Sequence, residues 1–176
     1  MRENALDLKS AIRDVPDFPK KGIIFKDITT LISRGEYLRE AIDRICSHFA
    51  KSGVQKIAGI ESRGFIFGAP IAYRLGIGMV PVRKKGKLPY KTVSASYLLE
   101  YGTDTVEMHE DAVSPGEKVL IIDDLLATGG TASAAVELAK KMGADVVGVA
   151  FLIELSFLEG RKKLRDCGEI FSLIKY

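Results

Sequence analysis

The chain has 176 residues, 47% of them hydrophobic and 28% charged, with a formal net charge of +3 at pH 7, which is the composition of one globular domain with a sizeable core. No apolar stretch approaches the length of a membrane span, and the N-terminus lacks the apolar core of a signal peptide, so we expect a cytoplasmic protein without a membrane partner. The two cysteines lie far apart without a CxxC pattern, which disfavours disulfide and zinc sites.

The N-terminal segment carries an approximate helical stripe of apolar residues. We expect a helix here, ended by Pro16 and followed by an irregular loop around Pro19. A short apolar segment, residues 22–25, comes next. The residues of the stripe are Leu6, Leu8, Ala11, Ile12 and Val15.

The next region alternates helical and strand patterns. Residues 37–51 carry apolar side chains at helical spacing and predict an amphipathic helix. Residues 56–60 predict a buried strand, and a helix is expected from about residue 64 to Leu75, where Gly76 ends it. A second strand is predicted over residues 78–82.

A basic segment, residues 83–89, has no apolar periodicity, and we expect it to form a mobile loop. Because the whole chain carries a net charge of only +3, this local charge favours an anion site over a nucleic-acid-binding face. We therefore expect no nucleic-acid partner. The basic residues in and beside the segment are Arg83, Lys84, Lys85, Lys87 and Lys91.

The C-terminal half continues with strand and helix patterns. Residues 93–99 and 103–109 predict a hairpin. A strand is expected over residues 118–122, a helix over 131–142 and another strand over 144–152. The repeated order of strand, helix and strand predicts an α/β fold with a largely parallel sheet, helices on both faces and a ligand site at the carboxyl ends of the strands.

The most informative motif is Val119–Thr131, an apolar run followed by two acids and a Thr/Gly-rich turn. Such a turn at a helix N-terminus presents backbone N–H groups to an anion, and the glycines permit close approach. No lysine follows the glycines, which disfavours a P-loop nucleotide hydrolase. A glycine turn with a threonine cap is the structural alternative. The predicted phosphate-binding residues are Ala127, Thr128, Gly129, Gly130 and Thr131.

Asp123 and Asp124 stand directly before this turn. Carboxylates can accept hydrogen bonds from the two ribose hydroxyls, and their charge can stabilise positive charge that develops at an anomeric carbon. Because adjacent strand residues point to opposite faces, both acids can serve one ligand only where the strand has begun to turn. The alternative is that one of them is a helix-capping or solvent-exposed acid.

The motif resembles the phosphoribosyl-diphosphate-binding motif of the type I phosphoribosyltransferases. Four further blocks in the same order make nearly the whole chain similar to the adenine phosphoribosyltransferases of that family. The resemblance implies the type I fold, with a mostly parallel central sheet flanked by helices, in a single domain with a small N-terminal hood over about residues 1–34 and a core over about 35–176. The four blocks are Asp17–Asp27, Glu61–Phe65, Arg83–Pro89 and Leu99–Gly102.

The resemblance also implies a reaction and partners. A glycosyltransferase of the pentosyl class would join adenine to 5-phosphoribosyl-1-diphosphate and release AMP and diphosphate. Mg²⁺ would be the cofactor, held mainly through substrate and water and not directly by protein ligands. The family further implies a homodimer.

Diphosphate carries the largest charge of the substrate, so a basic loop that closes over it would neutralise the leaving group and exclude water. Arg83, Lys84 and Lys87 are the residues predicted for this role, and the family implies that Arg83 reaches the site of the partner subunit. The resemblance adds Ser62 and Arg63 as diphosphate-binding residues, with unusual peptide geometry near Ser62. A surface ion pair for Arg63 and a solvated basic loop are the alternatives.

The segment Ile24, Phe25 and Lys26 is predicted to bind adenine. Phe25 could stack on the base, and family members read adenine partly through the backbone at the positions of Ile24 and Lys26. Lys26 replaces a frequent arginine of the family, which would affect specificity if the side chain took part. A buried structural role is the alternative for Phe25.

Glu100 is the remaining predicted catalytic residue, beside Asp123 and Asp124. A carboxylate there could assist proton movement or stabilise oxocarbenium character, and a salt-bridged hairpin acid is the alternative. Tyr101 is predicted to complete the site of the neighbouring subunit. Two other functions stay open: transfer to a different purine base, and a non-catalytic regulator that binds phosphoribosyl diphosphate.

Overall fold

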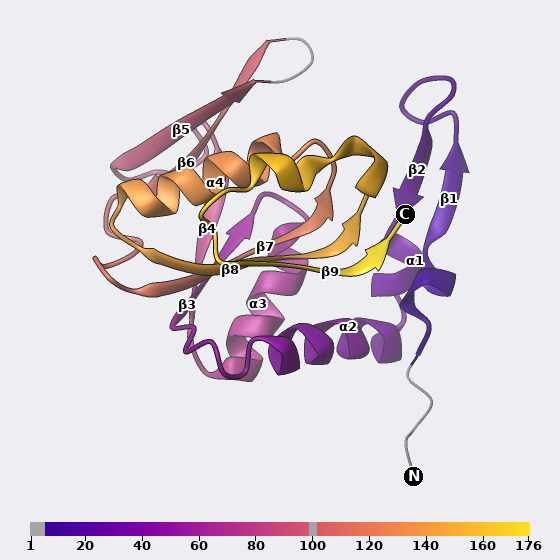
Figure 1. Ribbon diagram of the computed structural model, residues 1–176, viewed down its shortest axis with the longest axis horizontal. Coiled ribbons are helices and arrows are strands. Elements are labelled where there is room, and N and C mark those ends of the chain that lie inside the picture. The colour runs from indigo at the N-terminus through magenta and orange to yellow at the C-terminus, as the bar shows by residue number, and fades with distance from the viewer. Residues whose placement is uncertain (1–5, 99–101) are drawn as a thin grey trace. The chain divides into compact units, whose positions relative to one another are not determined.

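The computed structural model describes residues 6–98 and 102–176, and contacts within the chain divide it into two compact units, residues 1–44 and 45–176 (Figure 1). The smaller unit contains a two-stranded sheet and the larger unit a seven-stranded sheet. Among the residues that the structure describes, no helix is long and apolar enough to cross a membrane.

The N-terminal unit does not begin with the predicted α-helix. A short 3₁₀ helix, η1 (Leu8–Ala11), is followed by strand β1 (Arg13–Pro16), which pairs antiparallel with β2 (Ile24–Asp27). The apolar spacing of this segment led to the wrong prediction of an α-helix, because one 3₁₀ turn is enough to bury Leu8 and Ala11. The next apolar residue, Val15, lies opposite Phe25 in the ladder.

Two α-helices follow these strands. Helix α1 (Thr29–Ile32) buries Leu31. Helix α2 (Gly35–His48) confirms the amphipathic helix predicted over residues 37–51, although it ends three residues earlier. The division between the two units falls inside α2, so the proposed hood boundary near residue 34 stays a prediction.

The larger unit is built on one seven-stranded sheet in the order β5-β6-β4-β3-β7-β8-β9. Strands β4, β3, β7, β8 and β9 are parallel to their neighbours in that row, whereas β5 and β6 pair antiparallel with each other and β6 pairs antiparallel with β4. This confirms the mostly parallel α/β fold. The strands are β3 (Lys56–Ile60), β4 (Gly78–Lys84), β5 (Thr92–Leu98), β6 (Thr103–His109), β7 (Lys118–Leu126), β8 (Asp145–Glu154) and β9 (Glu169–Lys175).

Helices cover both faces of this sheet (Figure 1). Helix α3 (Gly64–Leu75) packs on β3, β4 and β7, and α4 (Gly130–Lys141) packs on β5, β6, β7 and β8. The central strand β7 is therefore apolar on both sides, as expected for a parallel strand between two helical layers. Its residues Val119–Ile122 are fully buried.

The last part of the chain differs most from the prediction. Strand β9 was not predicted, because its residues are mostly half-buried and lack a clear alternation. Two short 3₁₀ helices, η2 (Ser156–Leu158) and η3 (Gly160–Lys163), connect β8 to it. This connection passes behind the turn that precedes α4, where it shapes the candidate site.

Candidate active site

The turn between β7 and α4 forms a small hollow at the carboxyl end of the sheet. It has a volume of about 80 Å³. Helix α4 begins at Gly130, so the first backbone N–H groups of the helix lie at this hollow, where they favour an anion. All five predicted phosphate-binding residues line it together with Asp123: Ala127, Thr128, Gly129, Gly130 and Thr131.

The residues Ala127–Thr131 are called the phosphate loop. A glycine outside the motif, Gly160, packs against the backbone of this loop and fixes its shape. Gly129 has a left-handed φ of 78°, and a Cβ added there would lie 2.4 Å from the carbonyl oxygen of Gly160. A Cβ on Gly160 would lie 2.2 Å from the Ala127 oxygen and 3.1 Å from the Gly129 nitrogen. Two backbone segments therefore touch directly, and only glycine fits between them.

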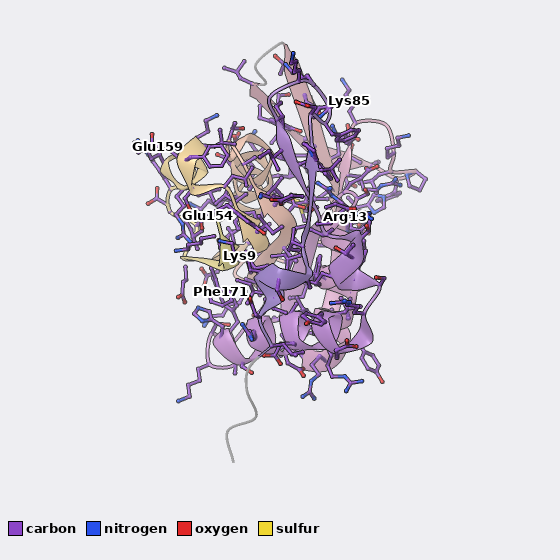
Figure 2. The ribbon with its side chains drawn as sticks, turned by 90° about the vertical axis from the view of Figure 1, so that its right-hand side faces the viewer. Lys9, Arg13, Lys85, Glu154, Glu159 and Phe171 are labelled. Carbon is purple, nitrogen blue, oxygen red and sulfur yellow. The ribbon has the colours of Figure 1, made fainter. Side chains whose placement is uncertain are left out.

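A buried ion pair anchors the segment that carries Gly160. Glu154, at the end of β8 (Figure 2), is only 5% exposed and accepts hydrogen bonds from Arg161 Nε at 2.7 Å and Nη2 at 2.8 Å. The Arg161 hydrogen bond holds the pKa of Glu154 below its ordinary value, although burial opposes this. Sequence reasoning missed this pair, since Arg161 lies in a stretch without a recognisable motif.

Asp123 and Asp124 both lie within β7, because the strand continues to Leu126 instead of ending near residue 122. The expected early turn is therefore absent from this strand. Asp123 lines the phosphate-loop hollow, and its Oδ1 accepts a hydrogen bond from the Asp124 nitrogen at 2.8 Å. Asp124 is 4% exposed and pairs with Arg63, with 2.9 Å between Oδ2 and Nε.

The two acids differ in how their charge is compensated. Burial and the neighbouring Asp124 charge raise the pKa of Asp123 well above its ordinary value. Burial also raises the pKa of Asp124, but the Arg63 guanidinium acts in the opposite direction. A donor or cation that approaches Asp123 would therefore favour its charged form.

The segment Glu61–Gly64 leads into α3 and lies next to Asp123 and Asp124 of β7. The Glu61–Ser62 peptide is cis, which is the unusual geometry that was expected near Ser62. A Cβ on Gly64 would lie 2.6 Å from the Ile122 oxygen and 3.2 Å from the Asp123 Cα, so the segment packs directly on β7. The structure thereby brings Arg63 to the acids, where Asp124 holds it, and Ser62 precedes it in the chain as an exposed residue.

Arg83 and Lys84 belong to β4 and not to a loop, which corrects the prediction for the start of the basic segment. Arg83 donates from Nε to Glu61 Oε2 at 3.2 Å and from Nη1 to the Lys87 carbonyl oxygen at 3.0 Å. The Lys84 backbone N–H also donates to Glu61, at 2.9 Å. Lys85 (Figure 2) follows the strand end and is exposed. Lys87 is exposed as well.

Glu61 thus links two segments that were predicted separately to bind diphosphate. Burial raises its pKa, but hydrogen bonds from the Lys84 backbone and Arg83 outweigh that effect and hold the pKa below its ordinary value. The Lys84 ammonium pairs with Asp104 on β6. The role of Asp104 was not predicted from the sequence, because strand order is needed to show that β4 and β6 are neighbours.

Glu100 and Tyr101 lie outside the described residues. The hairpin on which they were placed is confirmed, with β5 and β6 antiparallel up to the pair Leu98 and Thr103.

In the N-terminal unit, Ile24, Phe25 and Lys26 lie in β2. Lys26 Nζ donates to Asp14 Oδ1 at 2.7 Å, and the ring of Phe25 packs edge to face on Phe18 with 5.2 Å between the ring centroids. The three residues therefore share a strand, and the lysine side chain is engaged by a carboxylate.

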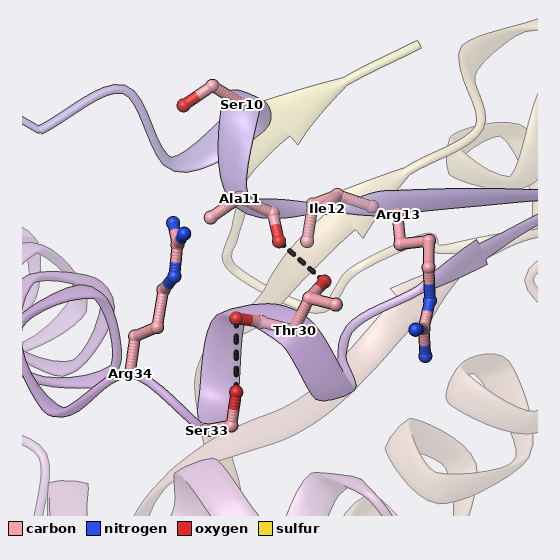
Figure 3. Close-up of a pocket in the computed structure, with 7 residues that line it drawn as sticks. All are labelled: Ser10, Ala11, Ile12, Arg13, Thr30, Ser33 and Arg34. Carbon is pink, nitrogen blue, oxygen red and sulfur yellow. Dashed lines mark hydrogen bonds between the residues drawn. The ribbon is translucent and has the colours of Figure 1, made fainter.

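A separate hollow of about 300 Å³ in this unit contains none of the three predicted adenine-binding residues (Figure 3). Its hydroxyl groups are used internally, since Thr30 donates to the Ala11 oxygen and Ser33 to the Thr30 oxygen. Arg13 is bound to Asp27, whose pKa is lowered to about 2 by the Thr29 backbone N–H and then by Arg13. The residues around the hollow are Ser10, Ala11, Ile12, Arg13, Thr30, Ser33 and Arg34.

Comparisons with known proteins agree with this arrangement. A family model described as a phosphoribosyl transferase domain matches residues 33–171. An adenine phosphoribosyltransferase of Desulfitobacterium hafniense is 60% identical over 98% of this chain and 99% of its own length. A second, from Thermotoga petrophila, is 56% identical over 97% of this chain and all of its own length.

Solved structures show the same likeness. The adenine phosphoribosyltransferase of Rhodothermus marinus has 54% sequence identity and a TM-score of 0.91, with 96% of each chain covered. That of Saccharomyces cerevisiae, complexed with an imino-altritol bisphosphate and adenine, has 40% identity and a TM-score of 0.89 over 95% of this chain and 96% of its own. The chain belongs to the adenine phosphoribosyltransferases, within the family of phosphoribosyl transferase domains.

Proposed function

We propose that this protein transfers the 5-phosphoribosyl group from 5-phosphoribosyl-1-diphosphate to adenine and releases AMP and diphosphate. The observation that carries the proposal is the convergence of separately predicted segments at the carboxyl edge of the sheet. The Arg63–Asp124 ion pair joins the start of α3 to the acids of β7, and the phosphate loop follows those acids directly. The relative from Saccharomyces cerevisiae, whose structure contains adenine, supports the choice of base.

The phosphate loop fits the 5′-phosphate of the substrate. Its hollow lies where α4 begins, so backbone N–H groups and the positive end of the helix dipole face the anion. Thr128 and Thr131 add hydroxyl groups to the lining. Backbone contacts of this kind fix the position of one end of the substrate before the reaction begins.

The two acids fit the ribose and the charge that develops on it. Asp123 lines the phosphate hollow, so it lies where the ribose would follow its 5′-phosphate. Asp124 is the next residue of the strand and is paired with Arg63, so it would reach the ribose only if the strand turned there and Arg63 released it. Their oxygens can accept hydrogen bonds from ribose hydroxyls. As the bond to diphosphate breaks, negative charge nearby stabilises the positive charge at the anomeric carbon.

Adjacent carboxylates also fit Mg²⁺ that is held mainly by substrate phosphates and water. Asp123 and Asp124 carry carboxylate oxygens beside the phosphate loop, and they are the residues that would support the hydrated ion through its water molecules. When bound, Mg²⁺ neutralises charge on the diphosphate leaving group.

Diphosphate would be held by cations that have acidic partners in this structure. Arg63 pairs with Asp124, Arg83 with Glu61 and Lys84 with Asp104. A diphosphate would have to draw these cations away from their carboxylates. Ser62 and Lys87, both exposed next to these cations, complete the proposed group.

Adenine would bind along β2. This strand pairs with β1 in a two-stranded sheet. As the family resemblance implies, the backbone of Ile24 and Lys26 would recognise the polar edge of the purine, and the ring of Phe25 would stack on the base. The Lys26 side chain is bound by Asp14, and recognition of adenine through backbone groups does not need it. Lysine in place of the family's frequent arginine is therefore compatible with this kind of recognition.

Three further parts of the proposal have no contact in the structure behind them: the first two rest on the family resemblance, and the third on the sequence pattern. Glu100 would assist proton movement at the base or stabilise the ribosyl cation. The chain would form a homodimer, in which Arg83 and Tyr101 contact the site of the partner subunit. The reaction would take place in the cytoplasm.

The test is to measure AMP formation from adenine and phosphoribosyl diphosphate with Mg²⁺. We expect diphosphate release that depends on adenine, and adenine should outcompete hypoxanthine and guanine when the bases are mixed. Folded protein that forms no AMP would disprove transfer, and preferential use of another base would disprove the assignment of adenine.

A further inference from the structure

Glu107 on β6 is a buried acid beside the basic segment. It is 7% exposed and lies opposite Arg83 in the ladder between β4 and β6. Its Oε2 accepts a hydrogen bond from the backbone N–H of Gly86 at 2.9 Å. A buried carboxylate costs free energy unless it is hydrogen-bonded, and an apolar side chain could fill the same position in the sheet without that cost. The acid at this position therefore indicates that its acceptor oxygens are needed.

The Gly86 N–H belongs to a turn at the end of β4, residues 84–87, which we call the basic turn. The backbone pairing with β6 reaches as far as Lys85, whose N–H donates to the Thr105 carbonyl oxygen at 3.1 Å. At the next residue the acceptor is the Glu107 side chain. This carboxylate therefore extends the hydrogen bonding of the sheet by one residue into the turn.

The basic turn connects residues that are proposed to bind diphosphate. The Lys87 N–H donates to the Lys84 carbonyl oxygen at 3.2 Å and closes the turn. The Lys87 carbonyl oxygen accepts from Arg83 Nη1 at 3.0 Å. Gly86, between the two lysines, has a left-handed φ of 78°, which glycine adopts without strain. A hydrogen bond that holds Gly86 therefore fixes the backbone from which the Lys87 side chain extends.

We propose that Glu107 is a positioning residue for diphosphate: its carboxylate accepts the Gly86 N–H and so holds the basic turn in the shape from which Lys87 reaches the leaving group. This inference rests on the proposed function, because it takes Lys87 as a diphosphate-binding residue. Glu107 acts through the backbone of the turn and does not contact the substrate itself. Its effect is therefore confined to ligands that contain diphosphate.

The decisive variants are Glu107→Leu and Glu107→Gln. Leucine fills a similar volume without an acceptor, whereas glutamine keeps an acceptor oxygen and removes only the charge. We expect diphosphate to inhibit AMP formation by Glu107→Leu about two- to tenfold more weakly than in the wild type, which is the size of one net hydrogen bond. Diphosphate should inhibit Glu107→Gln at least as strongly as the wild type, because the acceptor remains and a negative charge near the site is removed.

Two further measurements separate positioning from a general loss of structure. Ribose 5-phosphate carries no diphosphate, so its Kd, measured by calorimetry, should be unchanged in both variants. The Gly86 N–H should exchange with solvent faster in Glu107→Leu than in the wild type and in Glu107→Gln, as measured by NMR. Glu110→Leu is the matched control, because it removes an exposed acid just beyond β6 whose Oε1 is 3.9 Å from Lys91 Nζ. Inhibition by diphosphate should stay at the wild-type level in this control.

Several results would overturn the positioning role and leave the proposed function intact. One is inhibition of Glu107→Leu by diphosphate as strong as that of the wild type. Another is inhibition of Glu107→Gln as weak as that of Glu107→Leu, or a loss of ribose 5-phosphate binding in parallel with diphosphate. A Gly86 N–H that exchanges without protection in the wild type would overturn the role without any variant.

Failure of the proposed function would look different. Wild-type protein that forms AMP but is not inhibited by diphosphate would remove the diphosphate assignment, and this inference with it. Folded wild-type protein that forms no AMP would remove the proposed function and the inference together.

Discussion

The phosphate loop and the basic segment are two halves of one candidate site, but they are built on different principles. The loop is shaped by backbone against backbone, with Gly129 and Gly160 in direct contact and the Arg161–Glu154 pair behind them. The basic segment is held by long side chains and carboxylates, through Arg83 on Glu61 and Lys84 on Asp104.

This difference indicates how each half meets its ligand. A loop defined by packed backbone has one shape and presents its N–H groups without rearrangement, which is how a preorganised site binds. The cations of the other half already have partners, so a diphosphate must replace a carboxylate at each of them. We therefore expect the first half to be sensitive to shape and the second to charge.

The largest effect should come from a change of shape behind the loop. Gly160→Ala would place a Cβ 2.2 Å from the Ala127 oxygen, and neither of the two backbone segments can withdraw without distorting the loop. We expect kcat/KM for phosphoribosyl diphosphate to fall by about a hundredfold or more, since misplacement by about 1 Å has this cost. Gly35→Ala is the control, because nothing lies within 4 Å of a Cβ there. Near-normal kinetics in Gly160→Ala would show that the loop is not set by shape.

The second-largest effect should come from removing a negative charge next to the phosphate loop. Asp123→Asn and Asp124→Asn should each lower kcat roughly tenfold to a hundredfold, because each removes negative charge near the position proposed for the anomeric carbon. Their stabilities should differ in sign. Asp123→Asn removes a poorly compensated charge and should raise the free energy of unfolding by about 1 kcal/mol, whereas Asp124→Asn leaves Arg63 without its charged partner and should lower it by a similar amount. Chemical denaturation of both variants measures this, and wild-type kinetics in both would remove the acids from the mechanism.

The pH dependence of the free energy of unfolding tests whether the pKa of Asp123 is raised in the folded protein. Its pKa is raised in the folded protein above the ordinary value of 3.8. Such an acid contributes stability that is complete below the unfolded pKa and is lost as pH rises through the folded value. The advantage of Asp123→Asn over the wild type in free energy of unfolding should therefore grow with rising pH and then level off. A difference that is constant from about pH 4 to 8 would show that Asp123 is not perturbed.

The sequence predicted most of the core elements because their patterns are local. Strand β3 and helix α3 have the expected bounds, and the apolar run of β7 is the central buried strand. The phosphate loop could be predicted for the same reason, since its backbone conformation follows from adjacent residues such as Gly129.

What was missed depends on contacts between distant segments. Gly160 and Arg161 have no motif of their own, and their roles appear only when the β8–β9 connection is known. Glu61 begins a block that the sequence did single out, but its pairing with Arg83 depends on the contact between β3 and β4. The N-terminal helix was predicted wrongly because a stripe that includes Leu8 and Val15 fits both a helix and a turn followed by a strand. Pairing of β1 with β2 decided between them.

The smallest effect should come from a change of charge in the basic segment. Glu61→Gln keeps an oxygen that can accept from the Lys84 N–H but removes the carboxylate that competes for Arg83. We expect diphosphate to inhibit this variant about two- to fivefold more strongly than the wild type, because a half-buried pair near the surface such as Arg83–Glu61 is worth about 1 kcal/mol. The effect should shrink as salt is added.

The matched control is Glu110→Gln, which removes an exposed acid from the weaker pair with Lys91, where Nζ and Oε1 are 3.9 Å apart. Inhibition by diphosphate should stay at the wild-type level in this variant. If diphosphate instead inhibits Glu61→Gln more weakly than the wild type, the main role of the Glu61 carboxylate is to orient Arg83 and not to compete with diphosphate for it. The basic segment would then resemble the phosphate loop, with its geometry set in advance, and the contrast between the two halves of the site would be lost.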